Sequence, residues 1–266
     1  MSSNNTLLES VIATAKRAGD AIMAIYQQDF SVYEKSDQSP LTDADLAAHH
    51  IIVQELAGYS DYPILSEESA DISWTTRQNW GTYWLVDPLD GTKEFIKKNG
   101  EFTVNIALIE NGIPVLGVVY APVLNTCYSA NRNGAFKSDD KGTIAITATA
   151  PPPGSVCQVV GSRSHQSPEI QAWLDALPGE KNMVSMGSSL KLCLVAEGAA
   201  HLYPRLGPTC EWDTAAAHAI VRAAGGKVTI LHKDDTREDA IWADSQSPLL
   251  YNQKESLLNP YFLVSA

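Results

Sequence analysis

Residues 83–95 read Tyr-Trp-Leu-Val-Asp-Pro-Leu-Asp-Gly-Thr-Lys-Glu-Phe, and the interpretation of the whole chain starts there. The first four of them are aromatic or branched and carry no charge, which predicts a buried β-strand. Pro88 fixes its own φ and pushes the residue before it into an extended conformation. We therefore expect the chain to turn where this strand ends, with the carboxylates of Asp87 and Asp90 held close together.

Two carboxylates that are held close together repel each other, so a purely structural site would rarely keep both ionised. A divalent cation removes this conflict, because Mg²⁺ binds carboxylate, carbonyl and water oxygens. Gly91-Thr92 follows directly and is typical of the start of a short helix, whose free N–H groups suit a phosphate. The motif therefore indicates a metal and phosphate site, with an acid-rich turn that binds nothing as the alternative.

The length and charge of the chain limit what it can do. Its 266 residues are enough for one large domain or two closely packed ones. Lysine and arginine number 19 and aspartate and glutamate 31, a formal net charge of −12. This argues against a nucleic-acid polymer as partner, because such polymers are bound by basic surfaces. The charge would also repel a phosphorylated small molecule, so metal ions or local cations must reverse the field at any phosphate site.

The cysteines and the N-terminus indicate the compartment. The cysteines show no Cys-x-x-Cys pair, which is typical of reduced residues in a cytosolic protein. They are Cys127, Cys157, Cys193 and Cys210. The first residues lack the pattern of a signal peptide, and no apolar run approaches the length of a membrane span. We expect a cytoplasmic protein without an integral membrane segment, and we leave open its oligomeric state and any peripheral contact with the inner membrane.

The first half is predicted to combine helices with an antiparallel sheet. Residues 7–28 carry apolar side chains at helical spacing, and residues 30–40 are interpreted as a polar loop. Thr42 is expected to begin a second helix, with Asp45 three residues later as the acid of a capping box. The expected strands are 63–66, 83–86, 103–109, 114–121, 126–130 and 135–136, with turns at Asn111-Gly112 and Asn133-Gly134.

The second half alternates strands with helices, the pattern of an α/β layer. The expected strands are 155–161, 182–185, 200–203 and 227–231; the expected helices are 167–177, 190–198 and 213–224, followed by a last helix and strand. The Pro-Pro-Pro-Gly turn at 151–154 is the predicted boundary. It divides an α+β domain, 1–150, from an α/β domain, 151–266. The first has the antiparallel sheet and most of the candidate metal-binding acids. The second has Asp213 and the candidate substrate-selecting residues Ser188, Lys191 and Arg205.

Three motifs in the same order resemble those of the inositol monophosphatase family of lithium-sensitive, Mg²⁺-dependent phosphatases. They are Glu67-Glu68, Asp-Pro-Leu-Asp-Gly-Thr at 87–92, and Trp-Asp-Thr-Ala-Ala at 212–216. The resemblance implies a layered αβαβα sandwich of the inositol monophosphatase and fructose-1,6-bisphosphatase type over nearly the whole chain. It also implies hydrolysis of a phosphate monoester with two or three Mg²⁺ ions per site, and inhibition by Li⁺.

The resemblance assigns the acids of these motifs to metal ions. Glu67, Asp87 and the backbone carbonyl of Leu89 would hold one Mg²⁺. A second would be held by Asp87, Asp90 and Asp213. In two-metal sites one ion activates the attacking water and the other stabilises the leaving oxygen. Taken alone, Asp213 would instead be interpreted as an ordinary helix cap.

The resemblance also implies which residues handle the attacking water. Thr92, with Asp45 or Glu67, would take or orient its proton, and the N–H groups of Gly91 and Thr92 would hold the phosphate. The capping box gives Asp45 a structural alternative. No serine, cysteine or histidine constellation indicates a covalent intermediate.

Further cations indicate the substrate. Ser188 and Lys191 in Gly-Ser-Ser-Leu-Lys, and Arg205 in Tyr-Pro-Arg-Leu-Gly-Pro-Thr, resemble one branch of the family, the 3′(2′),5′-bisphosphate nucleotidases of sulfate assimilation. These residues, with Asp213, would bind the substrate, and residues 162–165 could meet it too. A second phosphate on the substrate gives a physical reason for extra cations. The alternative is that Lys191 and Arg205 only form surface ion pairs.

The reaction implied by this resemblance is removal of the 3′-phosphate from adenosine 3′,5′-bisphosphate (PAP), with PAPS as a further substrate, in sulfur assimilation and nucleotide recycling. The nearest alternative is an inositol monophosphatase-like enzyme of broad specificity, and fructose bisphosphatase activity is a weaker one. A nucleotide or metal sensor without catalysis would belong to a different class. The presence of Asp45, Glu67 and Thr92 argues against such a sensor.

Overall fold

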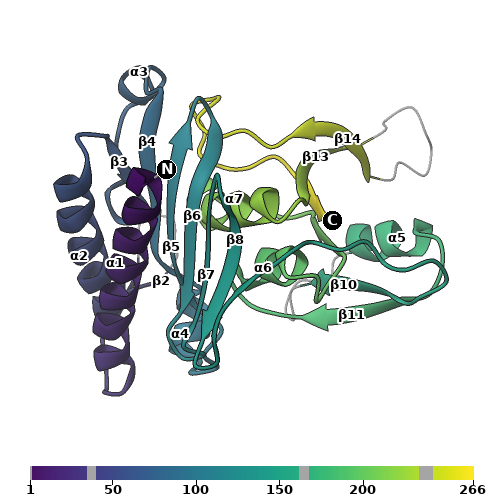
Figure 1. Ribbon diagram of the computed structural model, residues 1–266, viewed down its shortest axis with the longest axis horizontal. Helices are drawn as coiled ribbons and strands as arrows, with labels where there is room; N and C mark the ends of the chain where they lie inside the picture. The colour runs from purple at the N-terminus through teal and green to yellow at the C-terminus, as the bar shows by residue number, and fades with distance from the viewer. Residues whose placement is uncertain (1, 35–39, 162–167, 234–241) are drawn as a thin grey trace.

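The computed structural model describes residues 2–34, 40–161, 168–233 and 242–266, which are arranged in alternating layers of helix and sheet. Figure 1 shows a helical layer, a sheet, a second helical layer, a second sheet and a last helical layer in succession. The helical layers are α1 (Ser2–Tyr26) with α2 (Asp43–Tyr59), α6 (Leu190–Ala196) with α7 (Ala215–Ala223), and α5 (Pro168–Ala176). The predicted αβαβα sandwich is confirmed.

The first sheet has seven strands in the order β3-β4-β5-β6-β7-β8-β9. Only β3 and β4 run parallel, and every other neighbouring pair is antiparallel. At the predicted turn between β5 and β6, Asn111 and Gly112 have φ of 51° and 77°, as a two-residue hairpin loop requires. The strands are β3 (Ile64–Ser66), β4 (Thr82–Asp90), β5 (Thr103–Glu110), β6 (Ile113–Ala121), β7 (Thr126–Asn131), β8 (Gly134–Asp139) and β9 (Gly142–Ala145).

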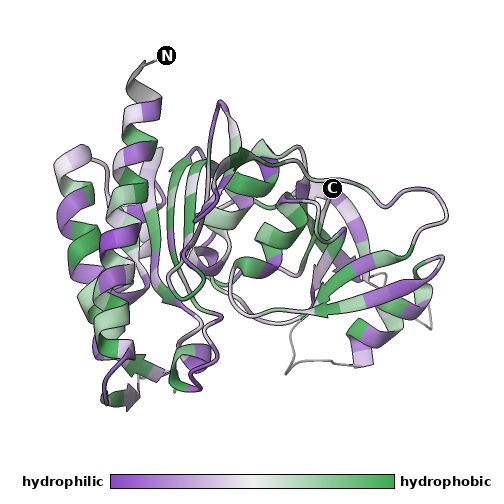
Figure 2. Cartoon of the chain, turned by 60° about the horizontal axis from the view of Figure 1, so that its bottom comes forward, coloured by the Kyte–Doolittle hydropathy of each residue, from purple (hydrophilic) through white to green (hydrophobic). Residues whose placement is uncertain are grey.

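Both faces of this sheet are covered, and the side chains of β4 alternate between them. Trp84 and Val86 pack with the apolar residues of α1 and α2, whereas Tyr83 and Leu85 pack with those of α6 and α7. Figure 2 shows the strands and the helices between the sheets as mainly hydrophobic, while the outer helices also carry hydrophilic residues. Burial on two sides explains why the start of β4 is an uninterrupted apolar run.

Helix α7 lies directly on β6, and this contact requires very small residues. A Cβ built on Gly117 would lie 2.1 Å from the carbonyl oxygen of Ala216 and 2.8 Å from the Cβ of Ala219. The alanines of α7 therefore permit close helix–sheet packing in addition to favouring the helix. The same packing brings the 3₁₀ turn before α7, η2 (Glu211–Asp213), into contact with β4.

The second sheet is mixed and has the order β11-β10-β12-β15-β13-β14. β10 runs parallel to β11 and β12, as the strand–helix alternation predicts, but β15, β13 and β14 add antiparallel pairs. The predicted last helix is not present in the described residues that follow β13: residues 242–266 contain two strands and irregular backbone only. The strands are β10 (Cys157–Gly161), β11 (Lys181–Ser185), β12 (Leu202–Arg205), β13 (Lys227–Lys233), β14 (Trp242–Pro248) and β15 (Phe262–Ser265).

The connections differ from the predictions in one further place. The segment interpreted as a polar loop contains two short strands, β1 (Val32–Glu34) and β2 (Pro40–Thr42), which pair with each other. The connection between β3 and β4 contains η1 (Glu67–Ser69) and α3 (Trp74–Arg77), and α4 (Thr92–Ile96) follows β4.

The boundary predicted at 151–154 lies between β9 and β10, where the chain leaves the first sheet for the second. One apolar core nevertheless includes residues from both sides of it, such as Leu85 and Val264. The division into two domains stays a prediction. Within the described ranges, the helices are either too short or too polar to cross a membrane.

Candidate active site

β4 does not end at Val86 as predicted, but continues through the acid motif to Asp90. The turn is replaced by an irregularity in strand pairing: Asp87 lies opposite Asn105, but Asp90 lies opposite Thr103. Three steps along β4 therefore match two along β5, which is a β-bulge. Pro88 explains it, because proline has no N–H for the ladder and is tolerated at bulges.

The bulge directs buried acids toward one another. Asp87 is 1% exposed and its Oδ1 accepts a hydrogen bond from the N–H of Leu89 at 3.0 Å. Its pKa is raised well above the ordinary value, first because it is buried and then because of the charges of Glu67, Asp90 and Asp213. The four predicted metal-binding acids thus act on one another electrostatically. In the described part of the chain, however, no three acidic, histidine or cysteine side chains are already arranged around a common metal position.

Asp213 reaches this group from the other half of the chain. It is the last residue of η2, so the helix predicted from Asp213 to Ala224 is present as α7 but begins two residues later, at Ala215. Its Oδ2 accepts a hydrogen bond from the N–H of Cys210 at 2.9 Å. Burial, followed by the charge of Asp90, raises the pKa of Asp213 to about 8, and Arg205 opposes the increase.

Asp45 contacts both the start of helix α2 and the acid motif, and its predicted capping role is the one that the structure confirms. Its Oδ2 accepts hydrogen bonds from the N–H of Thr42 at 2.8 Å and from the Thr42 hydroxyl at 2.5 Å, and the capping box at the start of α2 is confirmed. Its Oδ1 lies 3.2 Å from the hydroxyl of Thr92, which donates to it. The carboxylate therefore joins the start of α2 to the end of the acid motif.

Gly91 lies between Asp90 and the short helix α4, which begins at Thr92 as predicted. Its φ is +97°, and a Cβ at this position would lie 3.1 Å from the carbonyl oxygen of Glu101. Only glycine adopts this conformation readily. The motif therefore requires glycine here to turn the chain from the bulge into α4.

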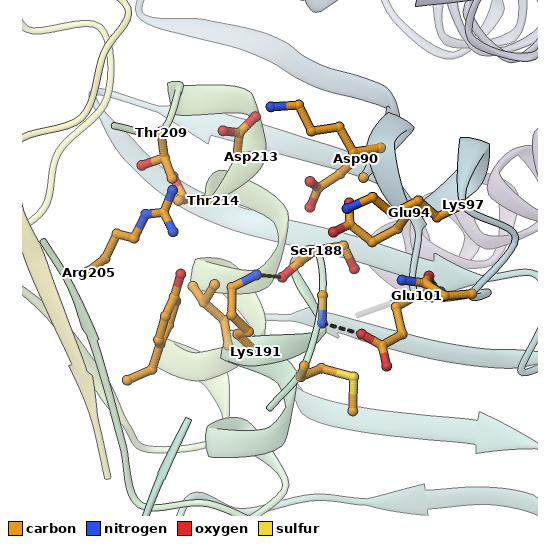
Figure 3. A pocket seen from close by; sticks show the side chains of 17 residues that line it. Asp90, Glu94, Lys97, Glu101, Ser188, Lys191, Arg205, Thr209, Asp213 and Thr214 are labelled. Atoms are coloured by element: carbon orange, nitrogen blue, oxygen red, sulfur yellow. Dashed lines mark hydrogen bonds between the residues drawn. The ribbon is translucent and has the colours of Figure 1, made fainter. Parts of the chain in front are cut away.

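A pocket of about 350 Å³ opens beside the acids and unites residues from both halves of the chain (Figure 3). It contains all the predicted substrate residues except Thr92, namely Gly91, Ser188, Lys191, Arg205 and Asp213. A second pocket of about 430 Å³ shares Lys93, Tyr203 and Arg205 with it. Its other lining residues are mainly apolar: Val160, Gly161, Ile170, Pro204, Leu206, Gly207 and Pro208.

The two predicted cations are held by backbone carbonyls. The Nζ of Lys191 donates to the carbonyl of Ser188 at 2.6 Å, and Nη2 of Arg205 donates to that of Pro208 at 2.7 Å. Among the described residues neither cation forms an ion pair, which does not support the alternative of surface ion pairs. Both retain N–H groups that can donate to a ligand.

Ser188 has two features that are expected of a ligand-binding residue. Its φ is +46°, in the left-handed region that non-glycine residues rarely adopt, and such strain is often found at functional sites. The residue is 8% exposed, and its hydroxyl has no hydrogen-bond partner within the described ranges. It lines the pocket, so a bound ligand would be able to satisfy this hydroxyl.

The structure adds pocket residues that the sequence interpretation missed. Lys93 and Lys97 lie four residues apart at α4, so they share one face, and both line the pocket. In Figure 3, Lys97 lies on the side of the pocket away from Arg205. Their spacing directly after the motif is a signal that could have identified them. The predicted contact at residues 162–165 lies outside the described part of the chain.

Comparisons with known proteins agree with this geometry. Residues 3–260 match the sequence model described as "Inositol monophosphatase family". The chain is 50% identical to the 3′(2′),5′-bisphosphate nucleotidase CysQ of Escherichia coli, over 97% of this chain and 99% of that protein. It is 36% identical to the protein of the same name from Haemophilus influenzae, over 98% and 93% of the two chains.

A solved structure shows the same arrangement. The crystal structure of CysQ from Bacteroides thetaiotaomicron, described as a bacterial member of the inositol monophosphatase family, is 42% identical to this chain. The two superpose with a TM-score of 0.83 over 98% of this chain and 97% of the other. The match over nearly the whole length, together with three acid motifs whose carboxylates act on one another, leads to one conclusion: the chain belongs to the inositol monophosphatase family.

Proposed function

We propose that this protein is a Mg²⁺-dependent phosphomonoesterase that removes the 3′-phosphate of PAP to give AMP and phosphate, with PAPS as a further substrate. The single observation that carries the proposal is the shared wall of the two pockets. The half-buried acids Asp90 and Asp213 line the first pocket, Lys93 and Arg205 line both pockets, and mainly apolar residues line the second. A nucleotide with two phosphates matches this order of acidic, cationic and apolar surfaces, because ligand sites combine apolar walls with a few charged groups at defined positions.

The acids fit a hard divalent cation. Carboxylates and a backbone carbonyl, the donors offered by Glu67, Asp87, Leu89, Asp90 and Asp213, are the ligands that Mg²⁺ prefers. The raised pKa values of Asp87 and Asp213 are those of like charges buried together, which a cation would relieve. When bound, Mg²⁺ lowers the pKa of water and neutralises charge that develops on phosphate oxygens.

The remaining chemistry belongs to Thr92 and Asp45. The Thr92 hydroxyl donates a hydrogen bond to Asp45, so its oxygen lone pairs can accept a hydrogen bond from the attacking water. This hydrogen bond orients the water and directs the proton that the water must lose toward the Asp45 carboxylate, which can receive it. Glu67, which hydrogen-bonds with Asp87, is the second candidate for that proton.

The cations would hold the phosphate that is not hydrolysed. Lys191 and Arg205 line the pocket with Asp213, and Ser188 offers a hydroxyl between them and Asp90. Arg205 also belongs to the second, mainly apolar pocket, where the nucleoside would lie. An inositol phosphate has no apolar base to fill that pocket, and this favours the nucleotide.

A phosphate-release assay tests the proposal. Purified protein with Mg²⁺ would be given PAP, inositol monophosphate and fructose 1,6-bisphosphate at equal concentrations, and Asp90→Asn protein would serve as the control for contaminating phosphatases. We expect the largest kcat/KM for PAP. A larger value for inositol monophosphate would support the broad-specificity alternative, and no hydrolysis of any of the three would support a sensor.

A further inference from the structure

A row of buried polar side chains lies beneath Asp90. Thr103 and Asn105 are the residues of β5 that face the bulge of β4, and they are 0% and 1% exposed. Ser189, from the start of α6 in the other half of the chain, is also 1% exposed. Burial of three polar groups costs stability unless they are hydrogen-bonded, and here the hydrogen bonds converge on one carboxylate.

The hydrogen bonds of this row have a defined direction. The Thr103 hydroxyl donates to Oδ1 of Asn105 at 3.0 Å, which orients the Asn105 amide so that Nδ2 faces Ser189. Nδ2 then donates to the Ser189 hydroxyl at 2.7 Å and lies 3.3 Å from Oδ2 of Asp90. The Ser189 hydroxyl must therefore direct its own proton elsewhere.

Two acceptors are available for the proton of Ser189. Oδ2 of Asp90 lies 2.6 Å from the hydroxyl, and the backbone carbonyl of Asp213 lies at 2.7 Å. One hydroxyl thus contacts two of the proposed metal-binding residues, which belong to different layers of the fold. The backbone N–H of Ser189 donates to the same Oδ2 of Asp90 at 2.6 Å.

Ser189 occupies the N-cap position of α6, where a serine hydroxyl ordinarily accepts a hydrogen bond from the helix backbone. It does not do so here. The hydroxyl is turned away from its own helix toward Asp90 and Asp213, so helix capping does not account for a serine at this position.

We propose that Ser189, oriented by Asn105, is a positioning residue that holds the Asp90 carboxylate in register with the Asp213 segment and so sets the affinity of the site for Mg²⁺. The inference rests on the proposed metal role of Asp90 and Asp213. Residues that hold metal ligands in place are known to affect metal affinity strongly. With Oδ2 of Asp90 occupied by Ser189 and Asn105, Oδ1 is the oxygen left to face a cation.

Calorimetric titration of the full-length, substrate-free protein with Mg²⁺ tests this inference. Ser189→Ala removes the hydroxyl but keeps the backbone N–H, and we expect the Kd for Mg²⁺ to increase about 10- to 100-fold. Asn105→Ala should shift the Kd in the same direction. The Kd for Mg²⁺ of the double variant should be no larger than that of the more strongly affected single variant, because both side chains act through one carboxylate.

Ser129→Ala is the matched control, because it removes an equally buried serine hydroxyl (3% exposed) from β7. It should keep the parent Kd for Mg²⁺. In kinetic assays, Ser189→Ala should need more Mg²⁺ for half-maximal rate but keep the KM for PAP. If Ser189 acted in folding alone, Ser189→Ala would lower the melting temperature without raising the Mg²⁺ concentration needed for half-maximal rate. If Ser189→Ala does not fold, Ser189→Cys keeps the packing, weakens the donor and is measured instead.

A Kd for Mg²⁺ in Ser189→Ala within twofold of the parent and Ser129→Ala values would overturn the inference, as would additive effects in the double variant. The outcome is independent of the substrate. A parent protein that binds Mg²⁺ but does not hydrolyse PAP would refute the proposed function and leave the role of Ser189 intact.

Discussion

Thr92 and Asp45 are joined by a hydrogen bond of 3.2 Å, and the same carboxylate caps helix α2 with its other oxygen. One aspartate therefore fixes the position of a helix and the orientation of the hydroxyl that would face the attacking water. Oδ2 of Asp45 caps the helix through Thr42 and Oδ1 contacts Thr92, so the two roles can be separated by substituting Thr42 or Thr92.

Thr92→Val removes the hydroxyl without changing the size of the side chain. If Thr92 orients water, kcat for PAP should fall by about 10²- to 10⁴-fold, with little change in the free energy of unfolding. Thr42→Val removes the side chain of the capping box instead, and should cost about 0.5–2 kcal/mol of stability with a smaller effect on kcat. Steady-state kinetics and thermal unfolding of both variants measure the difference. Normal turnover by Thr92→Val would contradict the proposed role.

Asp90→Asn keeps the shape of the side chain and removes its charge from the acid group. Turnover with Mg²⁺ should fall by orders of magnitude, because one proposed ligand is lost from the second metal position. In EDTA the variant should be at least as stable as the parent, since the charge of Asp90 acts unfavourably on buried Asp87 and Asp213. Melting temperatures in EDTA and rates in Mg²⁺ test both statements. Near-parental activity would argue against the two-metal assignment.

Lithium should inhibit the enzyme much more than sodium does at the same ionic strength. Li⁺ is a small, hard cation that can replace Mg²⁺ among carboxylate oxygens, but it supplies only one charge. The measurement is the rate of PAP hydrolysis at fixed Mg²⁺ with increasing LiCl or NaCl. Equal inhibition by the two salts would mean that this site departs from its family.

Lys191→Ala should impair PAP far more than a small phosphate monoester. A charge-assisted hydrogen bond contributes roughly 1.5–3 kcal/mol, so the loss should be on the order of 10- to 150-fold in kcat/KM for PAP. Lys191 also holds the carbonyl of Ser188, and part of the effect could arise from movement of that loop. Lys97→Ala, on the side of the pocket away from Arg205, removes a cation without such a hydrogen bond among the described residues and separates the two causes. Equal losses for both substrates in Lys191→Ala would indicate a structural role.

Acid should destabilise the protein partly through His218. Burial, followed by the charge of Arg222, lowers the pKa of His218 to about 3, and its Nδ1 lies 3.0 Å from the Tyr251 hydroxyl. An unfolded histidine has a pKa of about 6.5, so between the two values only the unfolded state binds the proton. Stability is therefore lost as the pH falls below about 6.5, at up to roughly 1.4 kcal/mol per pH unit.

His218→Gln should reduce this slope when the free energy of unfolding is measured by urea titration between pH 5 and 7. His50→Gln, a change at an exposed histidine, is the control that leaves His218 in place. A slope in His218→Gln equal to that of the parent would contradict the buried, neutral state of the imidazole.

The sequence by itself determined the features that depend on neighbours along the chain. The buried strand at 83–86, the capping box of Thr42 and Asp45, and the turn at Asn111-Gly112 follow from local side-chain chemistry, and the structure has all three. The acid motifs and their order also identified the family, because each motif is short and contiguous.

Tertiary structure alone decided how these pieces meet. The bulge that extends β4 depends on its pairing with β5, and no local pattern shows which residues will face each other across a sheet. Likewise, the sequence did not show that β14 precedes β15 in the second sheet, because the irregular chain between these strands has no periodicity of its own. Ser189 and Asp90 are 99 residues apart, and their contact exists only because α6 lies against the first sheet. Such contacts arise from packing between layers, and they cannot be predicted from the order of residues along one strand or helix.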